Sequence, residues 1–238
     1  MIVTILQPSY IPWRGYFHQI AKSDLFIFYD DVQYDKRGWR NRNRIKTPFG
    51  VRWLTIPVHS SGAITRNIPI NEITIDWNEN WCEKHWQSIR QAYIKAHFFK
   101  NYYPLVSQFY DHHPDLLADY TIDLTISISR EIGITATEFL RSSTLEGITG
   151  QKTDRLIQIL KKVGATHYIS GPSAQDYIEE EAFIEAGISL EFMNYDYAPY
   201  PQLYPPYDPQ VSIIDQLFMM GPDTLQNIIS NLEGKKNE

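Results

Sequence analysis

Short apolar runs and helix-like stretches alternate at the start of the chain. Residues 2–6, IVTIL, are β-branched and apolar and run into Gln7 and Pro8, which predicts a buried strand followed by a loop. Apolar residues at helical spacing predict a helix over 13–23, and the run DLFIFYDD predicts a second buried strand over 24–31. This order of strand, helix and strand favours a right-handed crossover in a parallel sheet.

The middle of the chain has two other patterns. Residues 36–77 contain short or alternating apolar segments between Gly and Pro, which predicts a small antiparallel hairpin region. Residues 78–133 have apolar positions at helical spacing, and we expect Pro104 and Pro114 to mark the breaks between helices.

Strands and helices alternate again in the last third. Strands are predicted at 135–143, 166–170 and 188–194, with a helix that ends at Gly164 and a short helix over 179–187. We therefore predict an α/β fold, a three-layer sandwich with a mostly parallel sheet. One domain would span 1–234, with a basic β insertion at 36–77, a helical insertion at 78–133 and a flexible tail at 235–238.

The composition is that of a folded acidic protein. The 238 residues are 43% hydrophobic and have a formal net charge of -6, which argues against DNA binding because that needs a basic face. The longest apolar runs are far shorter than the about 20 residues that cross a bilayer. We therefore expect no membrane span. Cys82 is the single cysteine, so we also expect no disulfide and no metal site, which agrees with a cytoplasmic protein. No pattern indicates an oligomeric state.

One segment concentrates positive charge in this acidic chain. It contains Arg37, Arg40, Arg42, Arg44, Lys46 and Arg52. In a strand, the alternation from Arg40 to Lys46 places four cations on one face, whereas Asn41 and Asn43 point the other way. Such a face favours a bound phosphate or carboxylate. The alternative is a charged edge strand that discourages aggregation.

Polar residues follow several of the predicted strands. They are Gln7, Pro8, Asp30, Asp31, Gln33, Ser142, Ser143, Ser170 and Gly171. Ligands of open α/β sheets bind beyond the carboxyl ends of the strands, so we expect these residues near a site. The adjacent carboxylates Asp30 and Asp31 could orient an amine, bind a metal or act as a base, although Asp is also a common strand terminator.

Three further features are candidates for the site. The loop from Gln7 to Tyr16 is stiffened by prolines, and Gly15 would let the backbone approach a ligand or would pack the helix on the sheet. Lys152 and Arg155 lie at a predicted helix start, where free N–H groups attract anions. His85 lies among aromatic residues, as a candidate catalytic residue or as a packed one.

Several long stretches of the sequence resemble the WbqC-like family. They are QPSYIPWRGYFHQIAKSDLFIFYDDVQYDKRGWRNRNRIKTPFG, LTIPV, GQKTDRLIQILKKVGATHYISGPSAQDYI and PYPQLYPPYDPQVSIIDQLFMMG. The family is associated with bacterial O-antigen and other surface-polysaccharide gene clusters. The resemblance implies a glycine transferase that attaches an amino acid to an amino sugar.

The resemblance and the sequence patterns together define the candidate residues. The substrate-binding candidates are Gln7, Pro8, Tyr10, Gly15, Tyr16, Gln33, Trp39, Asn41, Arg42, Asn43, Arg44, Ser142, Ser143, Lys152, Arg155, Ser170, Gly171, Tyr177 and Gln202. The catalytic candidates are Asp30, Asp31 and His85. Asp215 is a further residue that the resemblance points to.

The first thirty residues are also similar to nucleotidyl transferases and pantothenate synthetase. Those enzymes hold ATP phosphates with a His-x-Gly-His loop, whereas the matching positions here are Trp13, Arg14, Gly15 and Tyr16. Both histidines are absent, which argues against ATP as a cofactor, although Arg14 could supply a positive charge.

The leading hypothesis is an aminoacyl transferase that acylates the amine of a nucleotide-activated amino sugar. The cationic strand would hold the diphosphate, and Asp30 would accept a proton from the amine. The amino-acid donor would arrive activated by ATP, as a thioester or on a tRNA. The alternatives are a non-catalytic sugar-nucleotide binding or scaffold protein and a nucleotidyl transferase.

Overall fold

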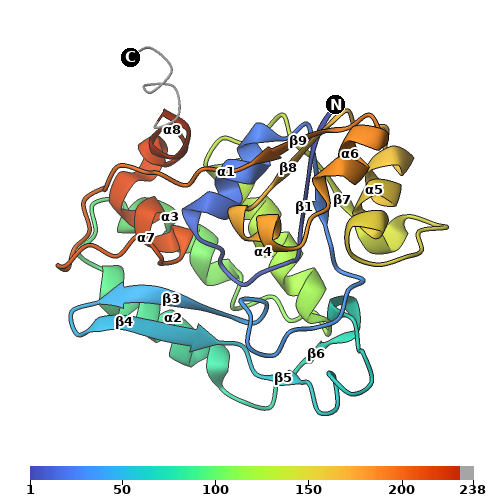
Figure 1. Cartoon of the computed structure of the whole chain (residues 1–238). Coiled ribbons are helices and arrows are strands. Elements are labelled where there is room, and N and C mark those ends of the chain that lie inside the picture. Colours follow the sequence, from blue (N-terminus) through green and yellow to red (C-terminus); the bar gives the residue numbers. More distant parts are fainter. Residues whose placement is uncertain (231–238) are drawn as a thin grey trace.

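The computed structural model describes residues 1–230 and has a five-stranded sheet at its centre (Figure 1). The strands are β1 (Ile2–Leu6), β2 (Leu25–Phe28), β7 (Glu138–Arg141), β8 (His167–Ser170) and β9 (Ser189–Phe192). They lie in the order β7-β2-β1-β8-β9, and every neighbouring pair is parallel. The predicted parallel sheet is confirmed.

Helices cover both faces of this sheet. Alternate residues of β1 and β2 point to opposite faces, as the period of a strand requires. Phe26 and Phe28 pack on the side of α1 (Arg14–Lys22) and α4 (Leu117–Glu131). Val3, Ile5, Leu25 and Ile27 pack on the side of α5 (Lys152–Lys162) and α6 (Glu180–Glu185). The fold is therefore an α/β sandwich of three layers, as predicted.

The strand order reverses at β1. The chain passes from β1 to β2 and then to β7 on one side, and it returns to the other side of β1 for β8 and β9. Helix α1 connects β1 to β2, and α5 precedes β8 and lies on the opposite face of the sheet. The point where the order reverses is the usual ligand site of such sheets.

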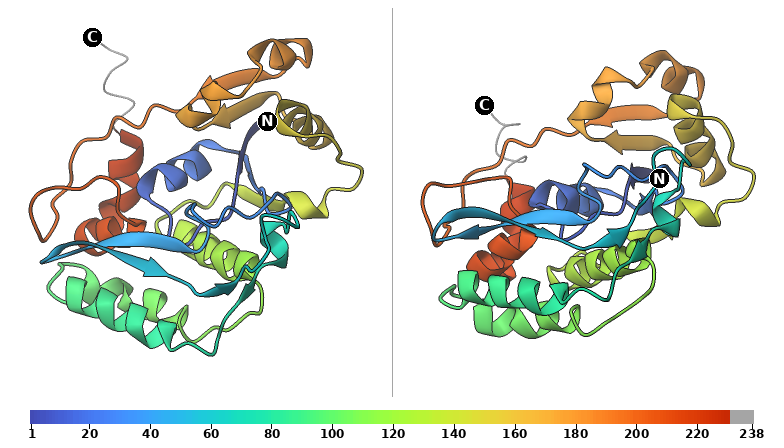
Figure 2. Two further views of the ribbon diagram at one scale, coloured as in Figure 1. Left: turned by 60° about the horizontal axis from the view of Figure 1, so that its bottom comes forward. Right: turned by 90° about the horizontal axis from the view of Figure 1, so that it is seen from below.

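An antiparallel hairpin and further helices lie beside the sheet (Figures 1 and 2). The predicted hairpin region contains β3 (Arg42–Thr47) and β4 (Gly50–Thr55), which pair antiparallel, and the short pair β5 (Val58–His59) and β6 (Thr74–Ile75). The helices are α2 (Trp81–Tyr93), α3 (Phe99–Gln108), α7 (Ile213–Met220) and α8 (Thr224–Ile229), with 3-10 turns at Ile70–Glu72, Ser142–Thr144, Pro172–Asp176 and Gly221–Asp223.

The hairpin and these helices share a core with one face of the sheet. Ile45 of β3, Ile89 of α2 and Leu217 of α7 belong to the same buried cluster as Phe17 of α1 and Phe26 of β2. The segments at 36–77 and 78–133 therefore bury their apolar side chains against the sheet layer.

Two details differ from the sequence-based expectations. Pro104 lies inside α3 and does not break it. Proline removes one backbone hydrogen bond of a helix, and because Pro104 is exposed, water can reach the carbonyl that it leaves free. Helices α7 and α8 were not predicted. The tail expected at 235–238 lies outside the described residues. No helix in residues 1–230 is long and apolar enough to cross a membrane.

His85 lies in an aromatic cluster between α2 and the loop after β1. It is 6% exposed, and its Nδ1 lies 3.0 Å from the hydroxyl of Tyr10. The ring of Trp81 packs against it edge-on, at 5.2 Å between centroids. Burial lowers the pKa of His85 from its ordinary value of 6.5 to about 4, because the charged imidazole would lose its hydration. The environment of His85 is that of a packed residue.

We expect the His85→Phe variant to weaken the loss of stability in acid. Between pH 6.5 and about 4 the unfolded chain binds a proton at His85 that the folded chain excludes. Unfolding is therefore favoured as the pH falls, by at most about 1.4 kcal/mol per pH unit for this group. Urea denaturation over this range measures the slope. In the control His97→Gln, which replaces an exposed histidine, the slope should change less than in His85→Phe. An unchanged slope in His85→Phe would contradict the prediction.

Candidate functional site

A cavity of about 750 Å³ lies at the carboxyl ends of β1 and β8. Gln7 follows β1, Ser170 ends β8 and Gly171 follows it, so the ends of both strands contribute directly to the wall. Helix α1 lines it through Tyr16, and helix α5 lines it through Lys152. The cavity therefore occupies the position where the strand order reverses, between helices from opposite faces of the sheet.

The lining of the cavity is aromatic, polar and cationic. The aromatic residues are Trp13, Tyr16, Tyr29, Trp39, Tyr168, Tyr177 and Tyr195, and the uncharged polar ones are Gln7, Ser9, Gln19, Asn43, Ser170, Ser173 and Gln210. Arg40 and Lys152 also line it. Within residues 1–230, no Asp, Glu or His side chain contributes to the wall. Because the wall carries cations and no carboxylate, the cavity favours an anionic ligand.

Arg40 brings a guanidinium group to the wall of the cavity. Its Nη1 donates to the carbonyl oxygens of Gln7, at 3.2 Å, and Pro8, at 3.4 Å, and its buried Nε has no partner. Burial lowers the pKa of Arg40, and the nearby Tyr16 and Asp35 oppose this shift. A guanidinium that is held by neutral carbonyls is a strong attraction for an anion.

Lys152 lies at the first residue of α5. Its side chain is exposed and makes no hydrogen bond or ion pair in the described part of the chain. The first N–H groups of a helix have no intrahelical partner and carry a partial positive charge. The ammonium group and the helix end therefore both contribute positive charge on this side of the cavity.

Trp13 lies across Gly15 at the start of α1. A Cβ atom at position 15 would lie 2.3 Å from Cζ2 of the indole, far inside van der Waals contact. The indole also contacts Tyr195 edge-on, at 4.9 Å between centroids. The indole of Trp13 thus occupies the space that a side chain at position 15 would need. Trp13 in turn lines the cavity.

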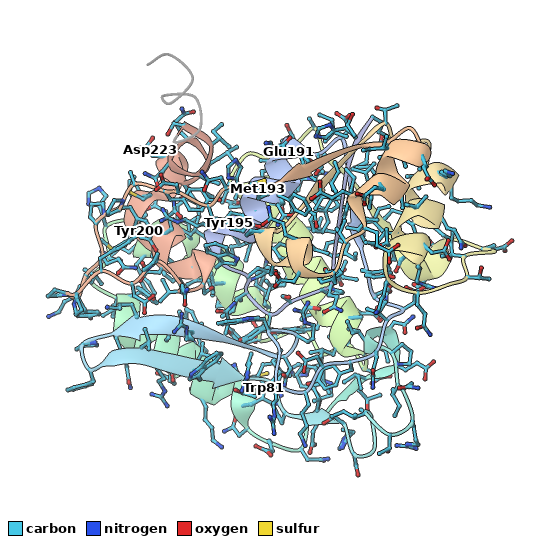
Figure 3. The ribbon with its side chains drawn as sticks, in the orientation of Figure 1. Trp81, Glu191, Met193, Tyr195, Tyr200 and Asp223 are labelled. Atoms are coloured by element: carbon cyan, nitrogen blue, oxygen red, sulfur yellow. The ribbon has the colours of Figure 1, made fainter. Side chains whose placement is uncertain are left out.

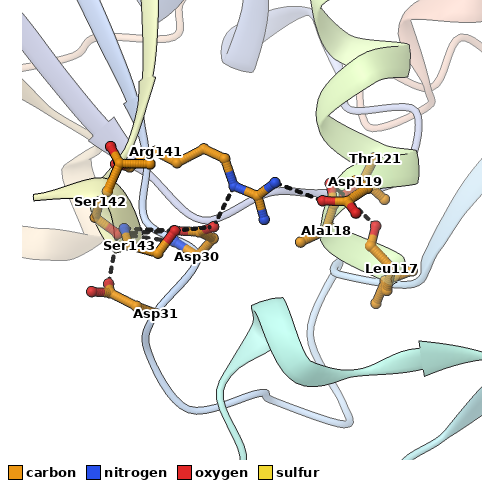
Figure 4. Close-up of polar contacts among 10 residues, drawn as sticks. Asp30, Asp31, Leu117, Ala118, Asp119, Thr121, Arg141, Ser142 and Ser143 are labelled. Carbon is orange, nitrogen blue, oxygen red and sulfur yellow. Dashed lines mark hydrogen bonds and ion pairs between the residues drawn. The ribbon is translucent and has the colours of Figure 1, made fainter. Parts of the chain in front are cut away.

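Asp30 and Asp31 lie in a separate polar cluster (Figure 4). Asp30 is fully buried and accepts hydrogen bonds from Arg141 Nε at 2.6 Å, from Ser143 N at 3.0 Å and from Ser143 Oγ at 2.9 Å. Asp31 accepts from Ser142 Oγ and from Arg155 Nη2, both at 2.6 Å. Neither carboxylate lines the cavity. The oxygens of both carboxylates already accept hydrogen bonds from residues at the end of β7, from the residues that follow it and from α5.

Arg141 connects this cluster to α4. Its Nη1 lies 2.6 Å from Asp119 Oδ1, and its Nε contacts Asp30 (Figure 4). One guanidinium group thus bridges carboxylates that follow β2 and that begin α4. The cluster fixes the ends of β2 and β7 relative to the helices.

Among the described residues, the cations of the hairpin make no ion pair with Asp30. Asn41 and Asn43 are buried and Arg42 and Arg44 are partly exposed, so the two faces of the segment alternate as expected. Arg42 lies 4.8 Å above the ring of Trp53. Arg44 Nη2 donates to the carbonyl of Gln210 at 2.6 Å.

These cations therefore already have partners, which are a backbone carbonyl and an indole ring. Lys46 likewise donates a hydrogen bond to the carbonyl of Pro206. Of the six cations in the segment, only Arg40 is among the described residues that line the cavity. The patch and Asp30 do not share the cavity, contrary to the expectation from the sequence.

The structure divides the predicted residues into two groups. Those that line the cavity are Gln7, Tyr16, Trp39, Asn43, Lys152, Ser170, Gly171 and Tyr177. The others lie elsewhere: Pro8, Tyr10, Gly15, Asp30, Asp31, Gln33, Asn41, Arg42, Arg44, His85, Ser142, Ser143, Arg155 and Gln202. Gln202, for example, donates to Asp215 Oδ1 at 3.0 Å, in a buried network with Tyr93 and Tyr200. Burial raises the pKa of Asp215.

Several lining residues were not among the candidates. Gln19 follows Gly15 by one helical turn, and Tyr29 directly precedes Asp30, so their positions next to predicted residues were a usable signal. Tyr195 and Gln210 come from the irregular segment between β9 and α7, which has no periodic pattern.

The loop after β1 differs from the ATP-binding loop of nucleotidyl transferases. Arg14 turns away from the cavity: it donates to the hydroxyl of Tyr207 at 2.9 Å and lies 4.3 Å above the ring of Tyr197. The positive charge expected from Arg14 is thus held by the segment after β9. No three His, Cys, Asp or Glu side chains of residues 1–230 are grouped so that they could hold a metal ion.

The fold is that of an α/β protein with a cavity at the point where the strand order of a parallel sheet reverses. Residues 7–227 match the WbqC-like protein family. The uncharacterized protein Rv1507c of Mycobacterium tuberculosis is 40% identical over 230 residues, which cover 94% of this chain and 97% of that protein. No solved structure matches the chain. This chain belongs to the WbqC-like family, and the resemblance inferred from its sequence is confirmed.

We expect the Gly15→Ala variant to be destabilised by a clash with Trp13. The added methyl group would overlap the indole, which should cost roughly 1–3 kcal/mol. In a Trp13→Phe background the ring atoms that it meets are gone, and the same change should stabilise the helix by up to about 1 kcal/mol. Chemical denaturation of the four proteins of this double-mutant cycle measures the coupling. An equal effect of Gly15→Ala in both backgrounds would contradict the packing role.

We expect the Asp30→Asn variant to lose stability. It leaves Arg141 and the Ser143 donors around a neutral, fully buried amide, which should cost roughly 2–4 kcal/mol. Asp119→Asn is the matched control, because Asp119 contacts the same guanidinium group but is 36% exposed. It should cost less than about 1 kcal/mol. If Asp30→Asn kept full stability and lost turnover instead, Asp30 would act as the base that the sequence suggested.

Proposed function

We propose that the cavity binds a nucleotide-activated amino sugar and that the protein transfers an aminoacyl group, such as glycyl, to its amine. The observation that carries the proposal is the pair Arg40 and Lys152, which line a cavity whose described wall contains no carboxylate. A diphosphate supplies the negative charge that this wall lacks. Guanidinium and ammonium groups and a helix N-terminus are the groups that bind phosphates in proteins.

The rest of the lining suits the neutral parts of such a ligand. A cavity of about 750 Å³ is within the usual range for ligands of this size. Exposed faces of Trp39 and Tyr177 can stack a base or a sugar ring, and the amides of Gln7, Gln19 and Gln210 can bind hydroxyl groups. The amino-sugar acceptor is further supported by the association of the family with surface-polysaccharide gene clusters in bacteria.

The proposed step is the acylation of a neutral amine. The nitrogen lone pair attacks the carbonyl carbon of an activated aminoacyl donor, a C–N bond forms, and the bond to the leaving group breaks. The proton of the amine departs with the leaving group. A free carboxylate does not acylate amines, so the donor must be an adenylate, a thioester or an aminoacyl ester.

A non-catalytic sugar-nucleotide binding protein is the second candidate. It is favoured by the absence of Asp, Glu and His from the described cavity wall, because these residues are the usual general bases. Nucleotidyl transfer has less support, since Arg14 contacts Tyr207 and does not line the cavity.

We expect the Lys152→Glu variant to bind UDP-glucosamine about tenfold or more weakly than the wild type, because it places a carboxylate next to the diphosphate. Titration calorimetry measures the change. Lys162→Glu is the matched control: it changes the same charge at the other end of α5, where the residue is exposed and does not line the cavity. Equal affinity of both variants would rule out the phosphate site.

Transfer is tested with the same protein. Wild-type protein is incubated with UDP-glucosamine and, in separate reactions, with glycine and ATP, with a glycyl thioester or with glycyl-tRNA, and a product heavier by one glycyl group is sought by mass spectrometry. A glycyl product that Lys152→Glu does not form supports the transferase. Binding without a product favours the non-catalytic role.

A further inference from the structure

Gln19 brings an unpartnered amide to the cavity. It lies on α1, is 2% exposed and lines the cavity. Its Nε2 donates a hydrogen bond to the hydroxyl of Tyr195, and its buried Oε1 has no partner in the described part of the chain. A buried acceptor without a donor costs about 1–3 kcal/mol, so folded proteins retain few of them.

Tyr195 completes the pair from the segment after β9, where it lies beside α1 (Figure 3). Its oxygen accepts the hydrogen bond of Gln19, and its own proton has no acceptor among residues 1–230. Burial raises the pKa of Tyr195, so the phenol stays protonated. A Cβ atom at Gly171 would lie 3.5 Å from the hydroxyl, so the missing side chain leaves space beside it.

The pair thus offers one acceptor and one donor next to each other. A ligand group that fills both must accept a hydrogen bond from Tyr195 and donate one to Gln19. A hydroxyl group and a neutral amine do both, and each would close a ring of three hydrogen bonds. An ammonium group has no lone pair and would leave the proton of Tyr195 without an acceptor.

We propose that Gln19 and Tyr195 hold the amino group of the acceptor sugar and select its neutral form. This inference rests on the proposed function and names the subsite for its nucleophile. Acylation requires the neutral amine, and a site that binds only this form supplies the amine in its reactive protonation state. The hydrogen bond from Tyr195 uses the lone pair of the nitrogen in the resting complex, and it breaks when that lone pair attacks the acyl carbon. Gln19 and Tyr195 would be positioning residues, because neither takes part in bond making.

The charges around the pair agree with this selection. Arg40 and Lys152 line the same cavity, and Arg14 and Lys22 belong to α1. His18 of α1 is neutral above its lowered pKa of about 4. Glu191 of β9 is paired with Lys22 and His167. Asp196, the residue after Tyr195, is exposed, and Tyr197 has a raised pKa. The described cavity wall therefore has no carboxylate to stabilise an ammonium group.

The test compares UDP-glucosamine with UDP-glucose, which has a hydroxyl group in place of the amine. Calorimetry between about pH 6 and 9 gives the ratio of the two affinities. As the pH rises toward the pKa of the free amine, we expect the affinity for UDP-glucosamine relative to that for UDP-glucose to increase by up to tenfold per pH unit. Any pH effect on the binding of the shared diphosphate affects both ligands and cancels in the ratio.

Two variants assign the effect to the pair. The Tyr195→Phe variant lacks the hydroxyl proton, for which an ammonium group offers no acceptor. The ratio of the two affinities should therefore become independent of pH. In Gln19→Leu both ligands should bind about tenfold more weakly, while the melting temperature stays the same or rises, because an unsatisfied buried amide has been removed. Tyr204→Phe is the control, since its hydroxyl donates to the carbonyl of Ala92 and does not line the cavity.

The outcomes separate this inference from the proposed function. If neither nucleotide sugar binds, the proposed function fails and the subsite with it. If both bind and the wild-type ratio does not change with pH, the subsite alone is refuted. A Gln19→Leu variant that binds normally, or one that loses affinity only because it unfolds, also refutes it.

Discussion

The parallel pairing of β1 with β2 on one side and with β8 on the other is the constraint on which the site depends. Because the chain leaves β1 in one direction and returns to it from the other, α1 and α5 cover opposite faces of the sheet. Neither helix closes the space beyond the ends of β1 and β8. The cavity is this space, and its wall comes from the loops and helix starts that surround it.

The same edge of the sheet separates two electrostatic environments. At the ends of β2 and β7, Asp30 and Asp31 are neutralised by Arg141 and Arg155 and by serine donors. At the ends of β1 and β8, cations line a cavity that has no carboxylate in the described residues. Acidic groups in the cavity wall would weaken its attraction for an anion. Asp30 and Asp31 lie outside the wall and are paired with arginines, so the cavity stays positively charged.

The sequence predicted the secondary-structure elements better than it predicted which elements lie side by side in the fold. The β-branched run at residues 2–6 coincides with β1, because a buried parallel strand is apolar on both faces. Sequence alone could place Asp30 and Ser170 at one edge of the sheet but could not order the strands along it. The pairing of β2 with β7 takes Asp30 to Ser143, and the pairing of β1 with β8 brings Ser170 to the cavity. Tyr195 lies on irregular chain, where no periodicity exists to locate it.

The unsatisfied groups of the cavity wall describe the ligand that would complete it. Arg40 has a buried Nε without an acceptor, and Gln19 has a buried Oε1 without a donor. A purely anionic ligand satisfies the first and not the second, and a purely cationic ligand would be repelled by Arg40 and Lys152. Both groups are satisfied by a ligand that is anionic at one end and carries a neutral hydrogen-bond donor at the other. A sugar nucleotide with a neutral amine meets this requirement, and an isolated phosphate or an isolated sugar does not.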